Sequence, residues 1–502
     1  MINAILNFSV RQRMLVILAT LALVGFGVLA VKQIPIDAFP DVTNVQVQVL
    51  ATTGGMSPPE VEKLVTRPIE WGIAGLPRLT ETRSVSKIGL AAITIVFEDG
   101  VNDYFARQLV SERLQSVRES LPAGVDVQLG PITTGLGEVF QYTLVSKDPK
   151  YDATELRTIQ DYIVRPILRT VPGVTDVNSF GGLVKQYQVI VNPDRLTSFG
   201  ITLAQVFEAL EKNNANASGN YIEHKSEQYI VRGLGLVKDV RDIGNIIVTA
   251  QNHTPIYIRD LAEVKIGAEL RQGAVTANGQ GEAVAGIVLM LKGASGRDVV
   301  NAVKVRLPTI QKALPKGVEL VPFYDRTELV QKAIHTVTKA LQEGAIFVLL
   351  ILIVLLADVR SAVIVTLVLP LAALFAFIMM KWYGLSANLM SLGGLAIGIG
   401  MMVDGAVVMV ENVHRHLTEV PDKEKHVHAG KVETVLYAAN AVGRPIVFGI
   451  AIIIIVFLPL FTLEGFEGKM FSPLAFTISF ALLGSLILSL TLVPTLCTFF
   501  LK

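Results

Sequence analysis

The sequence predicts an α-helical membrane protein that carries a large α+β domain outside the membrane. Of its 502 residues, 51% are hydrophobic, and the mean hydropathy of +0.52 is too high for a soluble protein of this size. Several long apolar runs approach the roughly 20 residues that a bilayer-spanning helix needs. A block with strand and helix patterns separates the first run from the rest, so we expect one span before residue 40 and five after residue 335.

The predicted spans lie at the two ends of the chain. Residues 1–33 hold an amphipathic surface helix and the first span, and residues 336–502 hold spans two to six. The first run lacks a small-residue cleavage site and continues into Lys32, so we interpret it as a retained span and not as a signal peptide. The surface helix is expected at Ile2–Val10, and the spans at Met14–Val31, Ala340–Ala357, Ser361–Met380, Gly384–Val403, Pro445–Phe461 and Pro473–Leu501.

Basic residues in the short loops predict the orientation, because Lys and Arg accumulate in cytoplasmic loops. Arg11 and Arg13 precede the first span, and Arg360 lies in the tight turn between spans two and three. All the basic loops fall on one side if the N-terminus is cytoplasmic, which places residues 40–335 outside. The remaining basic residues of these loops are Arg415, Lys423, Lys425, Lys431, Arg444 and Lys502.

The first outer unit, residues 34–133, has the order β-α-β-β-α-β of a ferredoxin-like fold. Alternating apolar residues indicate its strands, and Ser57 before two prolines and a glutamate indicates the start of its first helix. The expected elements are Val45–Ala51, Ser57–Trp71, Thr80–Ser86, Ala91–Phe97, Asn102–Leu121 and Val125–Leu129.

A second ferredoxin-like unit is predicted in two pieces, residues 134–183 and 274–335, with an insertion of residues 184–273 between them. The insertion has strands of its own, and we interpret it as a docking subdomain. It also carries a long polar arm, Asn213–Ser226. Two interpretations of the arm remain open: an irregular surface loop, or an arm that packs into a neighbouring subunit.

The fourth span carries the main functional candidate, Asp404, which is an ionisable residue within a long apolar run. An aspartate at the centre of a spanning helix costs about 2.5–3.5 kcal/mol on insertion scales, so such residues are usually functional. An apolar environment favours the uncharged form of a carboxyl group, which suits a proton carrier. The alternative is a structural hydrogen bond between helices.

Glu411 lies seven residues after Asp404, on the same helix face and roughly 10 Å along the axis. It is a candidate for a secondary proton relay, and the alternative is an interfacial charge at the helix end. Gly394 and Gly398 form a small-xxx-small pair that lets another helix approach closely.

Sulfur and imidazole groups are the candidate metal ligands. Met390 and Met402 lie on the fourth span, and thioether sulfur suits soft ions such as Cu(I). The alternative is that these methionines only pack. The following loop holds His414-x-His416 and His426-x-His428, which we interpret as a solvated, charged segment rather than a ligand cluster.

Several functional classes are excluded or unsupported. The net charge of +1 shows no excess of basic residues of the kind that nucleic-acid-binding proteins carry. The single cysteine, Cys497, permits no intrachain disulfide. The chain has no P-loop, so ATP is not the expected energy source, and no cofactor is expected. No constellation of a nucleophile and a base is evident, so we expect a transporter and not an enzyme.

At this point the residues resemble a known family. One span, a large outer domain and five further spans resemble one half of a resistance-nodulation-division permease. The pattern Asp404-Gly405, five residues, Glu411-Asn412 looks like the proton-relay motif of that superfamily. Residues Gln33–Val47 resemble the start of its heavy-metal efflux branch, the CzcA/CusA type. Drug exporters of the superfamily carry a second aspartate where this chain has Gly405.

The resemblance leaves the metal open between copper or silver and zinc, cobalt, cadmium or nickel. Zinc, cobalt and cadmium members commonly carry an acidic residue where this chain has Gly398. Copper and silver members have a small residue there and a route of methionines, two of which match Met390 and Met402. The corresponding position in span six is Leu482, which breaks that route, and copper members tend to have alanine in place of Gly405.

The resemblance also implies partners and a location. Such permeases have two tandem halves, so a second half would supply the lysine and threonine partners of Asp404. They work as homotrimers with a periplasmic adaptor and an outer-membrane channel, in the cell inner membrane. Two alternatives remain: a drug or organic-solute exporter of the same superfamily, and an accessory membrane protein that assists translocation.

Overall fold

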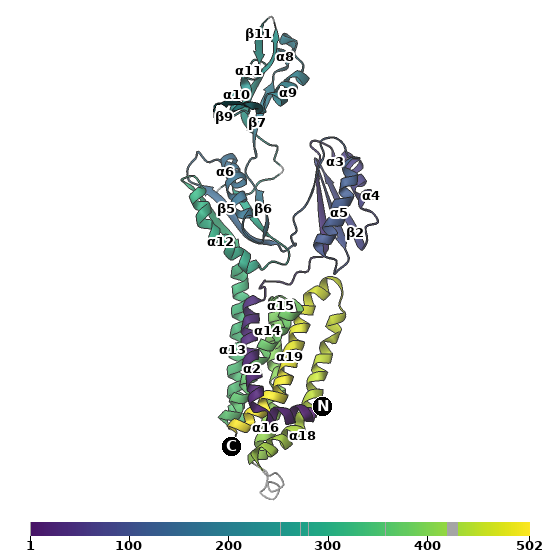
Figure 1. Ribbon diagram of the computed structural model, residues 1–502, viewed down its shortest axis with the longest axis vertical. Coiled ribbons are helices and arrows are strands. Elements are labelled where there is room, and N and C mark those ends of the chain that lie inside the picture. The colour runs from purple at the N-terminus through teal and green to yellow at the C-terminus, as the bar shows by residue number, and fades with distance from the viewer. Residues whose placement is uncertain are drawn as a thin grey trace.

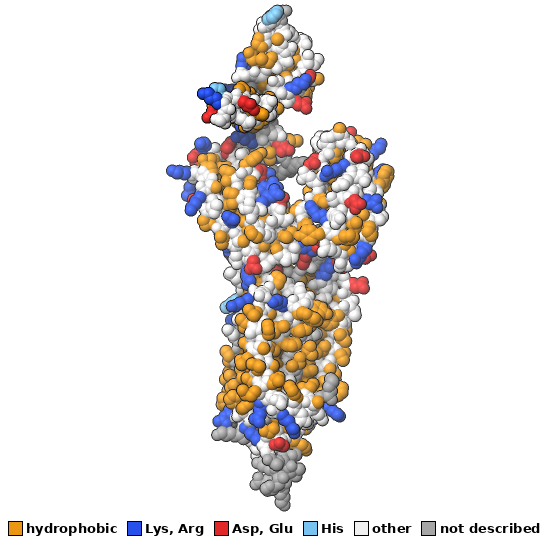
Figure 2. Space-filling model, in the orientation of Figure 1, with side chains coloured by type: hydrophobic (Ala, Val, Ile, Leu, Met, Phe, Trp, Pro, Cys, Tyr) orange, Lys and Arg blue, Asp and Glu red, His pale blue; other side chains and the backbone are white. Residues whose placement is uncertain are grey.

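The computed structural model describes residues 2–501 except 252, 272, 280, 357 and 419–429. The molecule is elongated (Figure 1), with a helix bundle at one end, two α/β units side by side beyond it and a third unit at the far tip. Six helices within the described residues are long and apolar enough to cross a membrane, as predicted. Hydrophobic side chains cover the bundle in a broad band, with Lys and Arg gathered at its lower end (Figure 2).

The bundle is built around three helices that are more deeply buried than the others. These are α14 (Val359–Tyr383), α15 (Leu389–Met402) and α19 (Gly465–Phe500), and their buried side chains form one large apolar cluster. A Cβ on Gly394 would lie 2.7 Å from the carbonyl oxygen of Leu474, so glycine lets α15 touch the backbone of α19 as the small-residue pair predicted. The other helices are α1 (Ile2–Arg11), α2 (Arg13–Gln33), α13 (Arg326–Leu356), α16 (Asp404–Thr418) and α18 (Lys431–Phe457).

The helix that contains the second predicted span is longer than the span itself. The span was expected after residue 335, and α13 is continuous from Arg326. Its first turns mix polar and apolar residues, so hydropathy marks only the later, apolar part of the helix. The outer domain therefore enters the bundle through an unbroken helix and not through a loop.

The first outer unit has a four-stranded antiparallel sheet in the order β2-β3-β1-β4. Two helical segments cover one face, and the apolar cluster between them and the sheet is the core of the unit. The element order is the predicted β-α-β-β-α-β. Its elements are β1 (Val45–Thr52), α3 (Pro58–Val61), α4 (Arg67–Ile73), β2 (Leu79–Lys87), β3 (Leu90–Phe97), α5 (Asp103–Arg118) and β4 (Asp126–Leu129).

The second outer unit repeats this arrangement with the sheet order β14-β5-β13-β6. Its elements are β5 (Glu138–Ser146), α6 (Ala153–Ile159), α7 (Arg165–Arg169), β6 (Val174–Phe180), β13 (Val284–Met290), α12 (Gly296–Ala313) and β14 (Val318–Asp325). In both units a π turn interrupts the first helix just before an Arg-Pro pair, at Arg67-Pro68 and Arg165-Pro166. Proline lacks the amide hydrogen that a regular turn would use, which accounts for the widened turn.

The inserted unit is attached through two antiparallel strands, β7 (Lys185–Val191) and β12 (Ala262–Ala268). Its small core lies under short helices and a second strand pair: α8 (Pro193–Phe199), α9 (Leu203–Lys212), α10 (Val240–Gly244), β10 (Ile247–Gln251), β11 (Thr254–Tyr257) and α11 (Ile258–Leu261). Most of the predicted polar arm, Asn213–Ser226, is not an irregular loop. From Ala217 onward it forms β8 (Ala217–His224) and a turn, and β8 pairs with the following strand, β9 (Glu227–Gly233), in a hairpin whose strand residues are all exposed.

Candidate functional site

The helical hydrogen bonding of the fourth span is interrupted directly before Asp404. Helix α15 ends at Met402 and α16 begins at Asp404. The hydroxyl of Ser485 on α19 donates to the Met402 carbonyl oxygen, and the amide of Ala406 donates to Val403 instead, at 3.0 Å. A side chain from another helix therefore takes the acceptor that a regular helix would use at this point.

Gly405 brings two other helices close behind the candidate aspartate. A Cβ at this position would lie 3.1 Å from side-chain atoms of Ile446 and Ile450 on α18, and 3.3 Å from the hydroxyl of Ser489 on α19. These distances are tighter than ordinary van der Waals contact. The absence of a side chain thus lets α16 pack tightly against α18 and α19 on a side about 100° around the helix from Asp404.

Asp404 itself lies on the open face of the bundle. The residue is exposed, and its carboxylate has no hydrogen-bond or ion-pair partner among the described residues. Ile397 and Val408, at helical spacing before and after it, are also exposed. An apolar stripe with a single carboxylate at its centre therefore faces away from the chain's own helices.

Glu411 is exposed on the same face, as its seven-residue spacing from Asp404 predicts. It too has no ion-pair partner among the described residues. Its neighbour Asn412 points inward instead and donates from Nδ2 to the carbonyl oxygen of Ala438 on α18, at 2.7 Å. The two acidic side chains of the motif thus share the open face, while the asparagine ties α16 to α18.

Buried hydroxyls on α19 are features of the site that sequence reasoning missed. Ser485 and Ser489 are fully buried and face α15 and α16 at four-residue spacing. Ser489 has no hydrogen-bond partner in the described part of the chain. Serine pairs at helical spacing within an apolar span are the signal that would have identified them.

The two candidate methionines do not form one site. Met390 is half-buried in the first turn of α15, where its amide is capped by Asn388, and Met402 is completely buried at the other end of that helix. Twelve residues of helix separate them by about 18 Å along the axis. Each could contact an ion only at a separate position along the span.

The histidine pairs do not form a metal centre in the described part of the chain, which contains no group of three His, Cys, Asp or Glu side chains placed to hold an ion. His414 lies 4.0 Å from Asp358 in the turn before α14, and His416 contacts the carbonyl oxygen of Asn412 at 2.9 Å. His426 and His428 lie outside the described residues.

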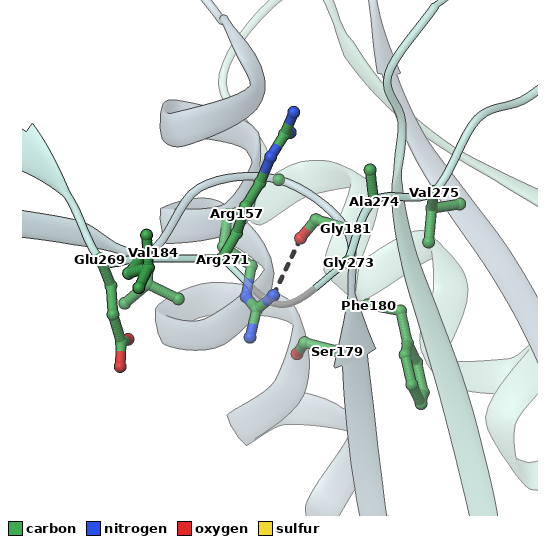
Figure 3. Close-up of a pocket in the computed structure, with 12 residues that line it drawn as sticks. Arg157, Ser179, Phe180, Gly181, Val184, Glu269, Arg271, Gly273, Ala274 and Val275 are labelled. Carbon is green, nitrogen blue, oxygen red and sulfur yellow. Dashed lines mark hydrogen bonds between the residues drawn. The ribbon is translucent and has the colours of Figure 1, made fainter. Parts of the chain in front are cut away.

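A cavity of about 360 Å³ lies where the inserted unit joins the second outer unit (Figure 3). Arg157 donates to the carbonyl oxygen of Gly181 at 2.8 Å and pairs with Asp161 at 2.7 Å, and Arg271 pairs with Glu282 at 2.7 Å. Both guanidinium groups are already neutralised by carboxylates of the chain. The arrangement fits a structural joint better than a site for a charged ligand.

Several known proteins are similar to this chain. Residues 5–502 match the AcrB/AcrD/AcrF family. The chain is 48% identical to the cation efflux system protein CzcA of Alcaligenes sp. (strain CT14) and 48% identical to the cobalt-zinc-cadmium resistance protein CzcA of Cupriavidus metallidurans, in each case over 100% of this chain and 48% of the relative.

A crystal structure of a heavy metal efflux pump superimposes with a TM-score of 0.86 at 37% identity, over 98% of this chain and 48% of the pump. The chain therefore spans about half the length of the relatives it matches.

Proposed function

Since the chain belongs to the AcrB/AcrD/AcrF family, we propose that it forms the N-terminal half of a proton-driven inner-membrane permease that exports heavy-metal cations. One observation carries the proton-driven part: a single carboxylate, Asp404, lies at the middle of a span on a face that the described helices leave open. The metal substrate is supported by the resistance and efflux proteins at 48% identity. The same relatives favour it over a drug exporter or an accessory translocation protein.

Asp404 acts as the proton carrier in this proposal. An ionised carboxylate in a low-dielectric environment requires a compensating cation, and Asp404 pairs with no lysine or arginine among the described residues. The second half of the permease supplies that partner on the open face. Protonation of Asp404 releases the partner and lets the fourth span move, and Glu411 serves as a secondary relay toward the cytoplasm.

The driving force is sufficient for such a movement. Each charge that crosses the membrane potential releases about 2.3 kcal/mol per 100 mV, which can bias a two-state element substantially. The movement is passed to the outer domain as alternating access for the metal ion. Met390 and Met402 provide successive soft contacts along the fourth span and do not chelate one ion together.

The outer domain forms the periplasmic part of the pump. Its two β-α-β-β-α-β units act as ferredoxin-like pore subdomains, and the inserted unit docks to an adaptor and an outer-membrane channel. The hairpin β8–β9 carries the trimer contact. Its strands expose Tyr221, Ile222, Tyr229 and Ile230 without cover from the described part of the chain, and an adjacent copy would bury them.

The test uses the full-length protein in a metal-sensitive host that lacks a pump of its own. Asp404→Asn should abolish resistance to zinc, cobalt or copper salts while the protein remains abundant and assembled, and Glu411→Gln should lower it less. Asp404→Glu is the matched control, because it keeps the carboxylate and should retain part of the activity. Normal metal resistance in the Asp404→Asn strain would overturn the proposal.

A further inference from the structure

The corner between the N-terminal helix and the first span contains an apolar groove that the transport mechanism does not use. Helix α1 lies across the base of the bundle, and α2 rises from it (Figure 1). The groove between them has a volume of about 450 Å³ and is closed at the back by α19. Its lining is Ala4, Ile5, Phe8, Ser9, Leu15, Val16, Ala19, Thr20, Leu23, Ile487, Leu488 and Thr491.

The few polar groups of the groove are already hydrogen-bonded within the protein. Its hydroxyls are engaged by their own helices: Ser9 donates to Ile5 at 2.8 Å, Thr20 to Val16 at 2.9 Å and Thr491 to Ile487 at 2.6 Å. Every other lining side chain is a hydrocarbon. The groove therefore accepts a hydrocarbon chain and excludes a hydrated ion or a polar solute.

The dimensions of the groove match one leaflet of a bilayer. From Leu15 to Leu23 the wall along α2 rises about 12 Å, whereas one leaflet contributes roughly 15 Å of hydrocarbon. Ile5, Phe8 and Leu15 remain 36%, 52% and 51% exposed, so the groove is open to the surrounding lipid. An acyl chain can therefore enter from the side and lie along α2.

Two unneutralised cations lie at the elbow between the helices, where the groove reaches the base of the bundle. Arg11 ends α1 and Arg13 begins α2. Neither guanidinium has an acidic partner in the described part of the chain, and Arg13 lies 5.4 Å from the ring centroid of Phe499. Two arginines beside an apolar groove are complementary to a lipid with a negatively charged headgroup.

We propose that this corner is a specific binding site for one anionic phospholipid of the leaflet next to the N-terminus. One acyl chain lies in the groove against α2 and α19, and Arg11 and Arg13 bind the phosphate. The lipid then fills the space between α1, α2 and α19 and fixes the angle at which α1 crosses the bundle. The site is separate from Asp404 and from the transported cation, so the lipid-binding proposal can be tested independently of the proposed function.

The test is native mass spectrometry of the purified, delipidated protein with added phosphatidylglycerol or phosphatidylcholine of identical acyl chains. The wild-type protein should prefer phosphatidylglycerol. The double variant Arg11→Gln/Arg13→Gln should lose about 30-fold of that preference, since each basic residue near an anionic headgroup contributes about a fivefold factor. Arg11→Lys/Arg13→Lys should keep most of it, and Lys32→Gln at the other end of α2 should change nothing.

A second pair of variants separates the groove from simple charge attraction. Ala19→Phe fills the groove and should weaken binding of both lipids, whereas Ala22→Phe adds the same bulk to an exposed position of α2 outside the groove and should not. Thermal unfolding of each variant shows that it is folded. Equal binding of the two lipids by the wild type, unchanged selectivity in the arginine-to-glutamine variant, or equal behaviour of the two phenylalanine variants would each overturn the proposal.

Discussion

Arg326 and Asp37 form an ion pair, with 2.7 Å between Nε and Oδ1, where the outer domain meets the helix bundle. Only 5% of the arginine side chain and 16% of the aspartate side chain are exposed. Arg326 also donates to the carbonyl oxygen of Leu136, and the amide of Asp37 donates to Ala387 at 3.1 Å. The pair therefore joins α13, the second outer unit, the segment after α2 and the turn before α15.

Removing the arginine of this pair should lower the stability of the protein substantially. Arg326→Gln leaves the Asp37 carboxylate buried without a counter-charge, and such losses typically cost about 3–5 kcal/mol. Burial raises the pKa of Asp37, and Arg326 opposes that rise. Removal of the arginine should raise the pKa further, so the penalty should shrink as the pH falls and Asp37 becomes protonated.

The measurement is thermal unfolding in detergent for Arg326→Gln, Asp37→Asn and the double variant, at neutral and acidic pH. The two changes should be strongly non-additive at neutral pH, with the double variant more stable than Arg326→Gln alone. If the two losses simply add, or if the loss in Arg326→Gln is independent of pH, the pair does not behave as described.

Alanine substitutions at three glycines of the fourth span should destabilise the protein to different extents, depending on which atoms the added Cβ would contact. Gly394→Ala places it 2.7 Å from a backbone carbonyl oxygen, Gly405→Ala places it 3.1 Å from the ends of two isoleucines, and Gly400→Ala meets nothing within 4 Å. Because a backbone moves less easily than a side chain, we expect losses of about 1–3 kcal/mol for Gly394 and less for Gly405. Gly400→Ala is the matched control and should be neutral or stabilising. Thermal unfolding in detergent gives the ranking, and a different order would contradict this packing.

Alanine substitutions at Ser485 and Ser489 on α19 remove the same hydroxyl group from two buried positions, so their effects on stability can be compared directly. Ser485→Ala removes the donor to the Met402 carbonyl oxygen and leaves that buried acceptor unsatisfied, which should cost about 1–3 kcal/mol. Ser489→Ala removes a hydroxyl without a partner and should be close to neutral. Chemical or thermal unfolding in detergent measures both, and equal losses would show that the Ser485 hydrogen bond does not stabilise the interrupted helix.

Asp325 should make stability depend on pH in a defined direction. Partial burial opposes ionisation, but hydrogen bonds from Lys304 and Thr327 outweigh it and hold the pKa of Asp325 below its ordinary value of 3.8. A carboxyl group whose pKa is lowered by folding stabilises the protein above its unfolded pKa, and this contribution is lost as the pH falls through the folded pKa.

Unfolding of the Asp325→Asn variant should therefore begin at a lower temperature than that of the wild type at neutral pH. The difference should narrow as the pH falls below 3.8. Glu319→Gln, on the same strand and without an ion pair in the described part of the chain, is the control. A difference between wild type and Asp325→Asn that is constant with pH would mean that the carboxylate charge is not the source of the effect.

The hairpin β8–β9 should control assembly. Ile222 and Ile230 are 60% and 75% exposed on paired strands. In the proposed trimer, aspartates at both positions would place charges in an apolar contact, so this double replacement should shift the full-length protein from trimer toward monomer in native mass spectrometry. The control is Glu223→Gln on the same strand. An intact trimer in the double variant would assign the trimer contact elsewhere.

Much of the fold follows from local patterns in the sequence. Six apolar runs give the six candidate spans, and alternation with turn residues gives the strand and helix order of the first outer unit. The start of α13 could not be predicted from hydropathy, because the turns from Arg326 to His335 mix polar and apolar residues, and they pack against α12 of the outer domain. The π turns could not be predicted either. Each one accommodates a proline inside a helix that is packed against a sheet, and this packing is not visible in the local sequence.

The candidate site was predictable to a similar degree. A lone aspartate in an apolar span and a glutamate seven residues later mark Asp404 and Glu411 as candidates without any structure, and their roles stay predictions. The pattern does not tell which helix face is open, and the structure leaves that face uncovered by the described part of this chain. The donor from Ser485 was not predictable, because it depends on the register between two helices that are distant in the sequence.

The unbroken course of α13 has a mechanical consequence. Its 31 residues contain no proline and form a rod of about 46 Å that is embedded at one end and attached to α12 at the other. A tilt of about 5° at the embedded end would displace the far end of such a rod by about 4 Å. That far end is Arg326, which the ion pair with Asp37 ties to the segment after α2, so any tilt of α13 would act directly on this buried pair.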